Sequence, residues 1–184
     1  MDNGESSYRR FLAGDDNGMV EIVREFRDGL MLYLRSYTED INAAEDCVQD
    51  TFIRLAVKKP KFSGRSTFKT WLYTIGRNIA IDNVRKSRRH RGVSLSECAV
   101  LADEADLEQS YLVSEQKINL RHAICRLREE YQQVLYLTYF ESFSNEETAK
   151  IVGKSKKQIE NLLYNARKAL RTELEKGGFD YENI

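Results

Sequence analysis

The chain has 184 residues, 41% of them hydrophobic, which suffices for one large domain or two small ones and excludes a disordered chain. Its 29 basic and 29 acidic residues cancel, so any argument from charge depends on where the charges lie. The three cysteines are scattered, no charged-then-apolar leader opens the chain, and no apolar stretch reaches the about 18 to 20 residues of a membrane span. A cytoplasmic protein with no membrane span is therefore expected.

Helix breakers are rare, since Pro60 is the only proline, and apolar residues recur every three or four positions. The chain is therefore predicted to be all-α. A first helix is expected over residues 17–38 and a second from about Asn42. The outward face of the second helix is polar and acidic, which suits solvent or a partner. This face carries Asp46, Gln49 and Asp50.

The stretch KKPKFSGRS ends the second helix, and Ser66 is expected to cap a third helix over residues 67–89. Phe68 and Trp71 begin its apolar stripe, and they are expected in the core rather than in a ligand platform. The helix ends in RKSRRHR, which has five Lys or Arg residues in seven and no acid. Solvated faces usually mix charges of both signs, so this run favours a polyanion partner.

An acidic stretch then separates two basic parts of the chain. Residues 92–116 hold six acidic residues and no Lys or Arg, and they lose the helical periodicity. This composition is typical of a flexible linker. The sequence therefore predicts two small helical domains, over residues 1–92 and 114–175, joined by an acidic linker over 93–113 and followed by a frayed tail over 176–184.

The second domain contains the pattern of a helix-turn-helix. After two helices expected over 114–129 and 131–140, Ser144 and Glu147 form a capping-box pattern, Gly153 suits a tight turn, and a longer helix opens at Ser155. Helical hairpins share this pattern, so alone it leaves DNA binding open. Basic residues around the turn and beyond it favour DNA, because they can neutralise phosphates. They are Lys154, Lys156, Lys157, Arg167, Lys168 and Arg171.

Metal and catalytic sites are not predicted. His122 and Cys125 lie three residues apart, and His90 and Cys98 are the other conceivable zinc ligands, but the spacing fits no known zinc finger. An interior cysteine on an apolar face usually belongs to the core. No carboxylate pair accompanies a histidine and no glycine-rich phosphate loop occurs, so the chain is predicted to be a non-enzyme without cofactors.

Three segments in this order resemble an extracytoplasmic-function (ECF) sigma factor of bacterial RNA polymerase, of the minimal two-domain class. They are AEDCVQDTFIRL, FSGRSTFKTWLYTIGRNIAIDNVRKSRR and LREEYQQVLYLTYFESFSNEETAKIVGKSKKQIENLLYNARKALRTEL. The resemblance covers nearly all of residues 15–175. It implies promoter-specific initiation of transcription, with core polymerase and promoter DNA as partners and an anti-sigma factor as a possible third partner.

The resemblance also implies roles for residues of the first domain. Asp46, Gln49 and Asp50 match the surface that grips the clamp helices of the largest polymerase subunit, while the flap of the second-largest subunit would hold the second domain. The loop over residues 61–66, with Asn78 close by, matches the element that captures a flipped base of the −10 promoter element. The −10 residues implied are Lys61, Ser63, Arg65, Ser66, Asn78, Asn83, Arg85, Lys86, Arg88 and Arg89.

In the second domain the resemblance implies contacts to the −35 element. The residues are Lys154, Lys156, Lys157, Gln158, Glu160, Asn161, Tyr164, Asn165 and Arg167. The family usually has basic or small residues at the positions of Glu160 and Asn165, so this chain departs from the pattern. Either an altered −35 sequence is read, because asparagine suits adenine and glutamate suits cytosine, or Glu160 pairs with Lys156 or Lys157.

Two other function classes stay open on the sequence. A conventional helix-turn-helix regulator would bind duplex DNA as a dimer without polymerase, and a helical adaptor would bind only proteins. The adaptor leaves both basic blocks unexplained, and a simple regulator needs no single-strand surface in its other domain. The sigma factor accounts for both basic surfaces and for the polar docking helix.

Overall fold

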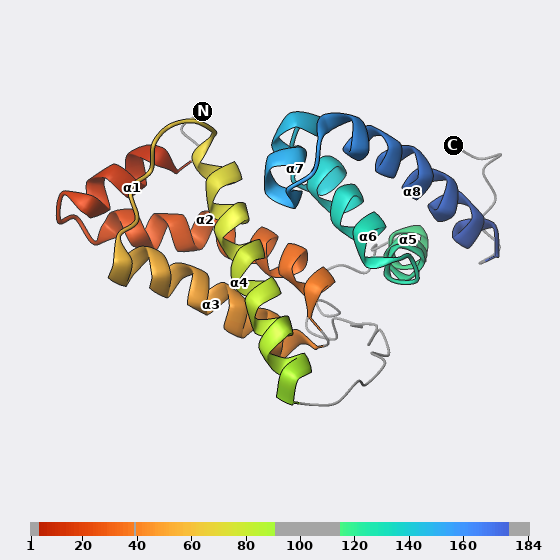
Figure 1. The fold of residues 1–184 in the computed structure, drawn as a ribbon, viewed down its shortest axis with the longest axis horizontal. Coiled ribbons are helices and arrows are strands. Elements are labelled where there is room, and N and C mark those ends of the chain that lie inside the picture. The colour runs from red at the N-terminus through yellow and green to blue at the C-terminus, as the bar shows by residue number, and fades with distance from the viewer. Residues whose placement is uncertain (1–3, 39, 91–114, 177–184) are drawn as a thin grey trace.

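The computed structural model describes residues 4–38, 40–90 and 115–176, and these form helices and connecting loops without strands. The first group of helices is α1 (Glu5–Leu12), α2 (Asn17–Leu34), the 3-10 turn η1 (Arg35–Tyr37), α3 (Ile41–Lys58) and α4 (Phe68–His90). The second group is α5 (Glu115–Cys125), α6 (Glu129–Leu135), the π-helical turn η3 (Tyr136–Phe140), α7 (Asn145–Val152) and α8 (Lys156–Lys176). The all-α prediction is confirmed (Figure 1).

Several predicted boundaries shift. The prediction missed α1, which lies before the first expected helix. The cap of α4 is Thr67 rather than Ser66, since the Thr67 hydroxyl accepts a hydrogen bond from the backbone N–H of Thr70. The last helix continues to Lys176, the first residue of the predicted tail. The acidic linker with Cys98 and the rest of the tail lie outside the described residues.

The core of the first group forms where α4 crosses α2 and α3. Tyr33, Leu72 and Tyr73 are fully buried, and Phe68 is 1% exposed. Trp71 is partly buried against the same core, so the expectation that these aromatic side chains pack inside is confirmed for Phe68 and in part for Trp71. Burial of such large apolar surfaces supplies most of the stabilisation of a small helical domain.

The helix-turn-helix forms as predicted from local signals. The Ser144 hydroxyl accepts from the Glu147 N–H, and the Glu147 carboxylate accepts from the Ser144 N–H, which completes the capping box of α7. Gly153 ends the helix with a φ of 71°, in the left-handed region that glycine tolerates. Ser155 and Gln158 repeat the capping arrangement at the start of α8.

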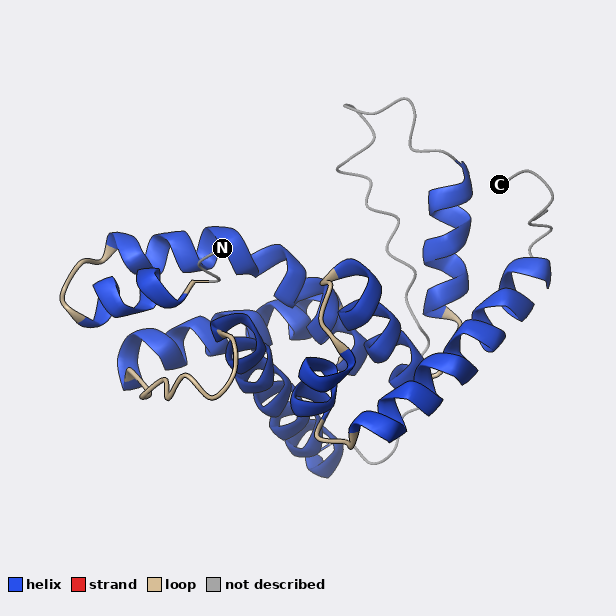
Figure 2. Ribbon diagram, turned by 90° about the horizontal axis from the view of Figure 1, so that it is seen from above, coloured by secondary structure: helices blue, strands red, loops and turns tan. Residues whose placement is uncertain are grey.

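The two groups of helices contact each other, chiefly where α7 packs against α4. In Figures 1 and 2 the second group lies at one end of the molecule and meets the first beside α4. The sequence gives no indication of this arrangement, because the residues that meet are separated by 68 to 85 positions in the chain.

Candidate docking and nucleic-acid surfaces

The outward face of α3 is exposed as predicted. Asp46, Gln49 and Asp50 are all exposed on it. Two apolar side chains, Ile53 and Val57, extend the same face and are 56% and 75% exposed. Helical spacing places all five on one side of α3. An apolar patch beside polar and acidic residues is typical of a protein docking surface. Sequence reasoning missed both apolar residues, although their positions one and two turns beyond Asp50 were a usable signal.

The loop between α3 and α4 presents polar side chains to solvent. Lys61, Ser63 and Arg65 are exposed, and Ser66 is half-buried. Asn78, expected close to this loop, lies about 15 Å along α4 from its first residue. It lines an open hollow of about 440 Å³ to which the loop does not contribute. The hollow is lined by Arg54, Ile75, Arg77, Asn78, Ile81, Asp82 and Arg85.

Basic side chains of the hollow and of the last described part of α4 form a cationic strip. Its members are Arg54, Arg77, Arg85 and Lys86. Arg85 and Lys86 are exposed, as expected, and the sequence reasoning missed Arg54 and Arg77, which lie outside the basic run. Asn83 is engaged within the protein, because its amide donates a long hydrogen bond of 3.4 Å to Asp50 of the α3 face. The backbones of Arg88 and Arg89 lie in α4, while their side chains lie outside the described part.

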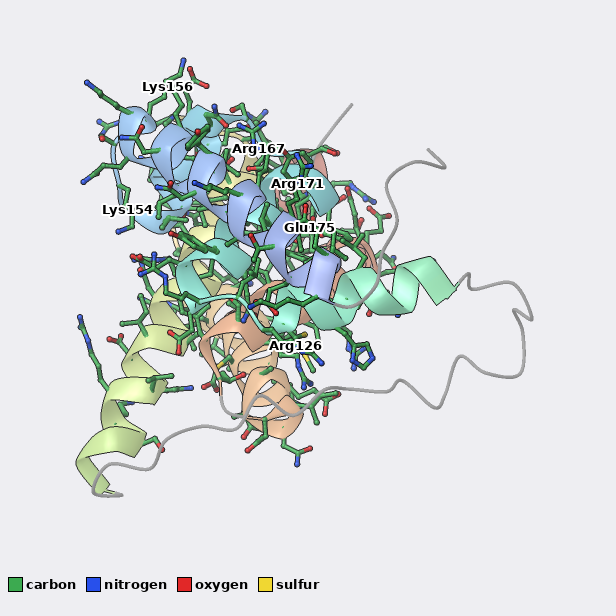
Figure 3. The ribbon with its side chains drawn as sticks, turned by 90° about the vertical axis from the view of Figure 1, so that its right-hand side faces the viewer. Arg126, Lys154, Lys156, Arg167, Arg171 and Glu175 are labelled. Atoms are coloured by element: carbon green, nitrogen blue, oxygen red, sulfur yellow. The ribbon has the colours of Figure 1, made fainter. Side chains whose placement is uncertain are left out.

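The outer face of α8 is exposed to solvent. Glu160, Asn161, Tyr164 and Asn165 are all exposed, and Tyr164 reaches 66% exposure. In Figure 3, Lys154 and Lys156 lie near the start of α8, while Arg167 lies further along the same helix. Polar side chains flanked by cations are what a recognition helix needs.

Some of the predicted −35 residues have partners inside the protein. Gln158 caps the start of α8 through Ser155. Lys154 pairs with Glu130 at 2.9 Å, and Lys156 pairs with Glu146. This pairing with Glu146, and to a lesser extent the charge of Glu160, raises the pKa of Lys156. Lys157 is exposed, as is Arg167. The direct partner of Lys156 is thus Glu146 of α7 rather than Glu160.

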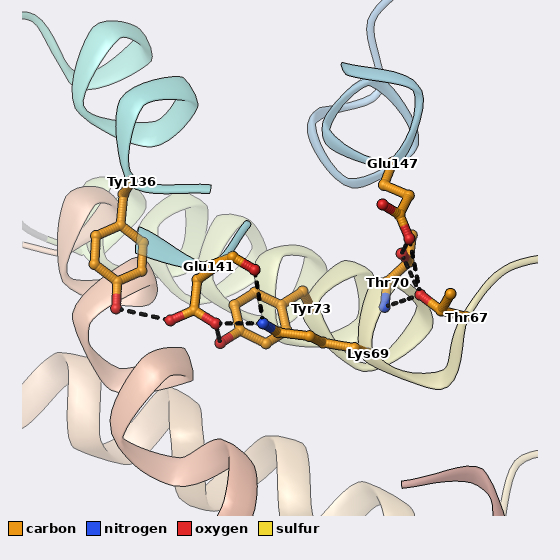
Figure 4. A network of polar contacts seen from close by, with 7 residues as sticks. All are labelled: Thr67, Lys69, Thr70, Tyr73, Tyr136, Glu141 and Glu147. Carbon is orange, nitrogen blue, oxygen red and sulfur yellow. Dashed lines mark hydrogen bonds and ion pairs between the residues drawn. The ribbon is translucent and has the colours of Figure 1, made fainter. Parts of the chain in front are cut away.

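A polar network joins the two groups of helices (Figure 4). The side chain of Glu141, 13% exposed, accepts hydrogen bonds from the hydroxyls of Tyr73 at 2.8 Å and Tyr136 at 3.1 Å. The ammonium of Lys69 lies 2.8 Å from the carboxylate and also donates to the Glu141 backbone carbonyl. Gly29 makes room for this carboxylate, since a Cβ there would lie 2.5 Å from its oxygen.

Glu147 extends the same contact to the first turn of α4. Its carboxylate accepts from the hydroxyls of Thr67 and Thr70 at 3.1 and 3.2 Å. Lys150, one turn further along α7, donates to the carbonyl of Arg65 at 3.5 Å. Burial on its own would raise the pKa of Glu147, but the hydrogen bonds from Ser144, Thr67 and Thr70 outweigh it and lower the pKa.

The lowered pKa of Glu147 predicts a pH-dependent contribution to stability. A carboxylate whose pKa is lowered in the folded state stabilises the protein at pH values above its ordinary pKa of 4.5. This contribution is lost as the pH falls through the folded-state pKa. We expect Glu147→Gln to lower the melting temperature by about 1 to 3 °C at pH 7, and the difference to shrink below pH 4.5. The control is Glu175→Gln, which alters an exposed pair with Arg171. A Glu147→Gln effect that stays constant with pH would contradict the assignment.

Within the described residues, the structure does not bring the conceivable zinc ligands together. His122 and Cys125 lie in α5, Cys98 lies outside the described residues, and only the backbone of His90 is described. Within the described ranges no group of three or more His, Cys, Asp or Glu residues is arranged to hold a metal ion. The helices of the described ranges include none that is long and apolar enough to cross a membrane.

Comparison with known proteins identifies two family regions in the chain. Family models of sigma-70 region 2 and sigma-70 region 4 match residues 22–90 and 117–170. The RNA polymerase sigma factor YlaC of Bacillus subtilis is 30% identical over 162 residues, which is 87% of this chain and 94% of that protein. The ECF RNA polymerase sigma factor SigW of the same organism is 26% identical over 171 residues, which is 88% and 91% of the two chains.

A solved structure gives the same result for the fold. The sigma factor RpoE from Bartonella quintana, crystallised with the anti-sigma factor NepR, superposes with a TM-score of 0.67 at 25% identity, covering 84% of this chain and 97% of that one. The two matched regions correspond to the two groups of helices. The chain therefore belongs to the sigma-70 family and is an extracytoplasmic-function sigma factor of bacterial RNA polymerase.

Proposed function

We propose that this sigma factor binds core RNA polymerase through the exposed face of α3, holds the melted −10 strand on the loop over residues 61–66 and on the cationic strip of α4, and reads the −35 duplex with α8. The observation that carries the proposal is the exposure, on one chain, of a recognition face on α8 and a mixed polar and apolar face on α3. A regulator that binds only duplex DNA needs the first face and has no use for the second.

Some of the proposed contacts position the DNA, and others read its base sequence. Lys157 and Arg167 are exposed cations that suit phosphates, whereas Asn161 and Asn165 suit base edges. Gln158 is proposed to support recognition by fixing the start of α8, because its side chain already caps that helix. On the −10 side, Arg85 and Lys86 suit the strand backbone, and an unstacked base would be held against polar groups of the loop or the hollow.

Simultaneous binding of both promoter elements requires the two domains to separate. Positions −35 and −10 are about 25 base pairs apart, or about 85 Å at 3.4 Å per base pair. In the structure, α7 touches α4 directly. A chain as long as residues 91–114 spans at most about 85 Å when extended, which is enough to allow separation. Docking on polymerase would hold the domains at the spacing that promoter DNA requires.

The same proposal assigns the domain bounds, the partners and the place of action of the protein. The domains are taken as residues 1–92 and 114–175, with the linker over 93–113 and the tail over 176–184. The protein would act in the cytoplasm with core polymerase, whose clamp helices would bind α3 and whose flap would bind the second domain. It would have no catalytic activity of its own, and an anti-sigma factor, as in the Bartonella quintana complex, would control it.

The proposal is tested by runoff transcription from a promoter library with core polymerase, with and without the protein. New start sites that share −35 and −10 elements at fixed spacing are expected. Duplex binding without polymerase is expected to be weak and to fall steeply with salt. No stimulation of polymerase together with tight duplex binding would instead establish a conventional regulator.

Glu160 is expected to set one base pair of the −35 element. It is exposed on the recognition face, and Lys156 is held by Glu146. Replacing Glu160 with Ala should relax the preference at one position by roughly 5- to 100-fold, the range for loss of one base contact. Binding-site selection on both proteins measures this, with Glu175→Ala as a control on the same helix. Unchanged selected sites would show that Glu160 reads no base.

A further inference from the structure

The first helix, α1, precedes the segment that matches sigma-70 region 2, which begins at residue 22. It nevertheless forms part of the aromatic cluster beneath the loop over residues 61–66. The ring of Tyr8, which is 1% exposed, lies 5.4 Å from Phe68 and 5.5 Å from Trp71 between centroids. Phe62, in the loop itself, packs against Trp71 at 5.2 Å. The helix and the loop therefore share one cluster.

The helix also holds the loop backbone at its start. The Tyr8 hydroxyl donates a 2.8 Å hydrogen bond to the carbonyl of Pro60. A tyrosine hydroxyl is protonated at neutral pH, and burial raises the pKa of Tyr8 further, to about 12. One residue earlier, Lys59 turns the chain with a φ of 43° and places its ammonium 4.7 Å from the centre of the Phe11 ring. Two residues of α1 thus fix the path by which the chain leaves α3.

These contacts matter because the loop has few others. Within the described residues, no backbone-to-backbone hydrogen bond ties residues 60–66 to another segment. Gly64, with a φ of 71°, has open space around it. The carbonyl of Arg65 is reached by Lys150, but this contact exists only while the two domains touch. In an open sigma factor the position of the loop depends on its anchors at α1 and α4.

The helix α1 is itself rigidly attached and can therefore serve as a support. Gly4 lets its start approach the rings of Phe26 and Phe68, where a Cβ would lie 2.7 and 2.8 Å away. The hydroxyl of Ser7 donates to Glu21 of α2 at 2.7 Å. At Gly18 the two helices approach so closely that a Cβ would lie 2.2 Å from the Ser7 carbonyl. Because α1 is fixed in this way, its contacts with Lys59 and Pro60 also fix the start of the loop.

We propose that Tyr8 is a positioning residue for the −10 site, and that its hydroxyl holds the loop in the conformation that receives single-stranded DNA. Tyr8 itself lies beneath the loop and does not touch the strand. Fixing the loop before binding removes part of the ordering cost that DNA would otherwise meet. The inference rests on the proposed function for its DNA part, whereas the anchoring of the loop can be tested without DNA.

The test is Tyr8→Phe in the full chain, which keeps the ring in the cluster and removes the hydrogen bond. Limited digestion with trypsin measures the loop, because Lys61 and Arg65 are cleavage sites within it. Cleavage at these two sites is expected to accelerate by about two- to tenfold, the range for the loss of one hydrogen bond. The control, Ile22→Val, makes a small change at a fully buried position of α2 without altering the loop contact.

A second measurement uses holoenzyme and a single-stranded −10 probe that carries 2-aminopurine. The dissociation constant is expected to rise by a similar factor for Tyr8→Phe but not for Ile22→Val, and duplex binding through α8 should not change. Unchanged loop cleavage, or equal cleavage in both variants, would overturn the anchoring. Faster cleavage with unchanged probe affinity would overturn the role in DNA binding. Wild-type holoenzyme that ignores the probe sequence would count against the proposed function and remove the DNA part with it.

Discussion

Reversing the charge of Asp50 with Asp50→Lys is expected to reduce transcription by this sigma factor with core polymerase by about 30-fold or more. Asp50 is exposed on α3 and lies next to the apolar patch of Ile53 and Val57. Placing a cation where a docking partner meets an acidic residue costs about 2 kcal/mol or more. Runoff transcription and a pull-down with core polymerase measure the effect. Because Asp50 is exposed, the melting temperature should change little.

The same face provides a charge-independent version of this experiment. Ile53→Ser removes an exposed apolar side chain, which leaves most proteins equally stable but weakens a surface that docks. It should lower polymerase binding about 5- to 30-fold, in the range of a partly buried interface residue. Asp16→Lys, an exposed charge reversal at the start of α2, is the matched control. Full activity of both Asp50→Lys and Ile53→Ser would contradict docking through α3.

The sequence was most informative where structure depends on neighbouring residues. The helix-turn-helix was predicted because Ser144 and Glu147 cap α7 and Gly153 ends it, and all three signals lie within ten residues. The outward position of Asp46 and Asp50 was predicted because helical periodicity assigns each residue to a face. Local signals of this kind do not need knowledge of the rest of the fold.

Other features depend on contacts between distant residues. The helix α1 was missed because it has eight residues and its role appears only when Tyr8 meets Pro60, 52 positions later. The closed arrangement was not predictable because the Glu141 carboxylate joins Tyr73 across 68 positions. Glu147 was recognised as a capping residue, but its second role toward Thr70 could not be seen in the local pattern.

Removing the carboxylate of Glu141 is expected to open the two domains. Glu141→Ala would leave the ammonium of Lys69, 24% exposed, without its ion pair, and the hydroxyls of the buried Tyr73 and the half-buried Tyr136 without their acceptor. Breaking a largely buried pair by removing one partner costs about 3 kcal/mol, which shifts the equilibrium between closed and open forms by about 100-fold. Small-angle scattering on the free protein should show a larger radius of gyration.

A second variant disturbs the contact of Glu141 from the first group of helices, at Gly29 of α2. Gly29→Ala would place a Cβ 2.5 Å from an oxygen of Glu141 and 2.5 Å from the Tyr73 hydroxyl, so the carboxylate must move away. Since alanine favours helix over glycine, α2 itself should not weaken. The buried Tyr73 hydroxyl must also shift, so a melting temperature close to that of the wild type is needed to separate opening from unfolding. Glu175→Ala, which removes an exposed ion pair in α8, should leave the scattering unchanged.

Opening also has a functional consequence that distinguishes it from simple destabilisation. In the closed form α7 covers the first turn of α4 through Glu147 and holds the Arg65 carbonyl through Lys150, while the recognition face of α8 stays exposed. Both opening variants should therefore bind single-stranded −10 DNA more tightly than the wild type and bind duplex −35 DNA unchanged. Equal gains on both DNAs, or no change in scattering, would show that the Glu141 contact does not control access to the −10 surface.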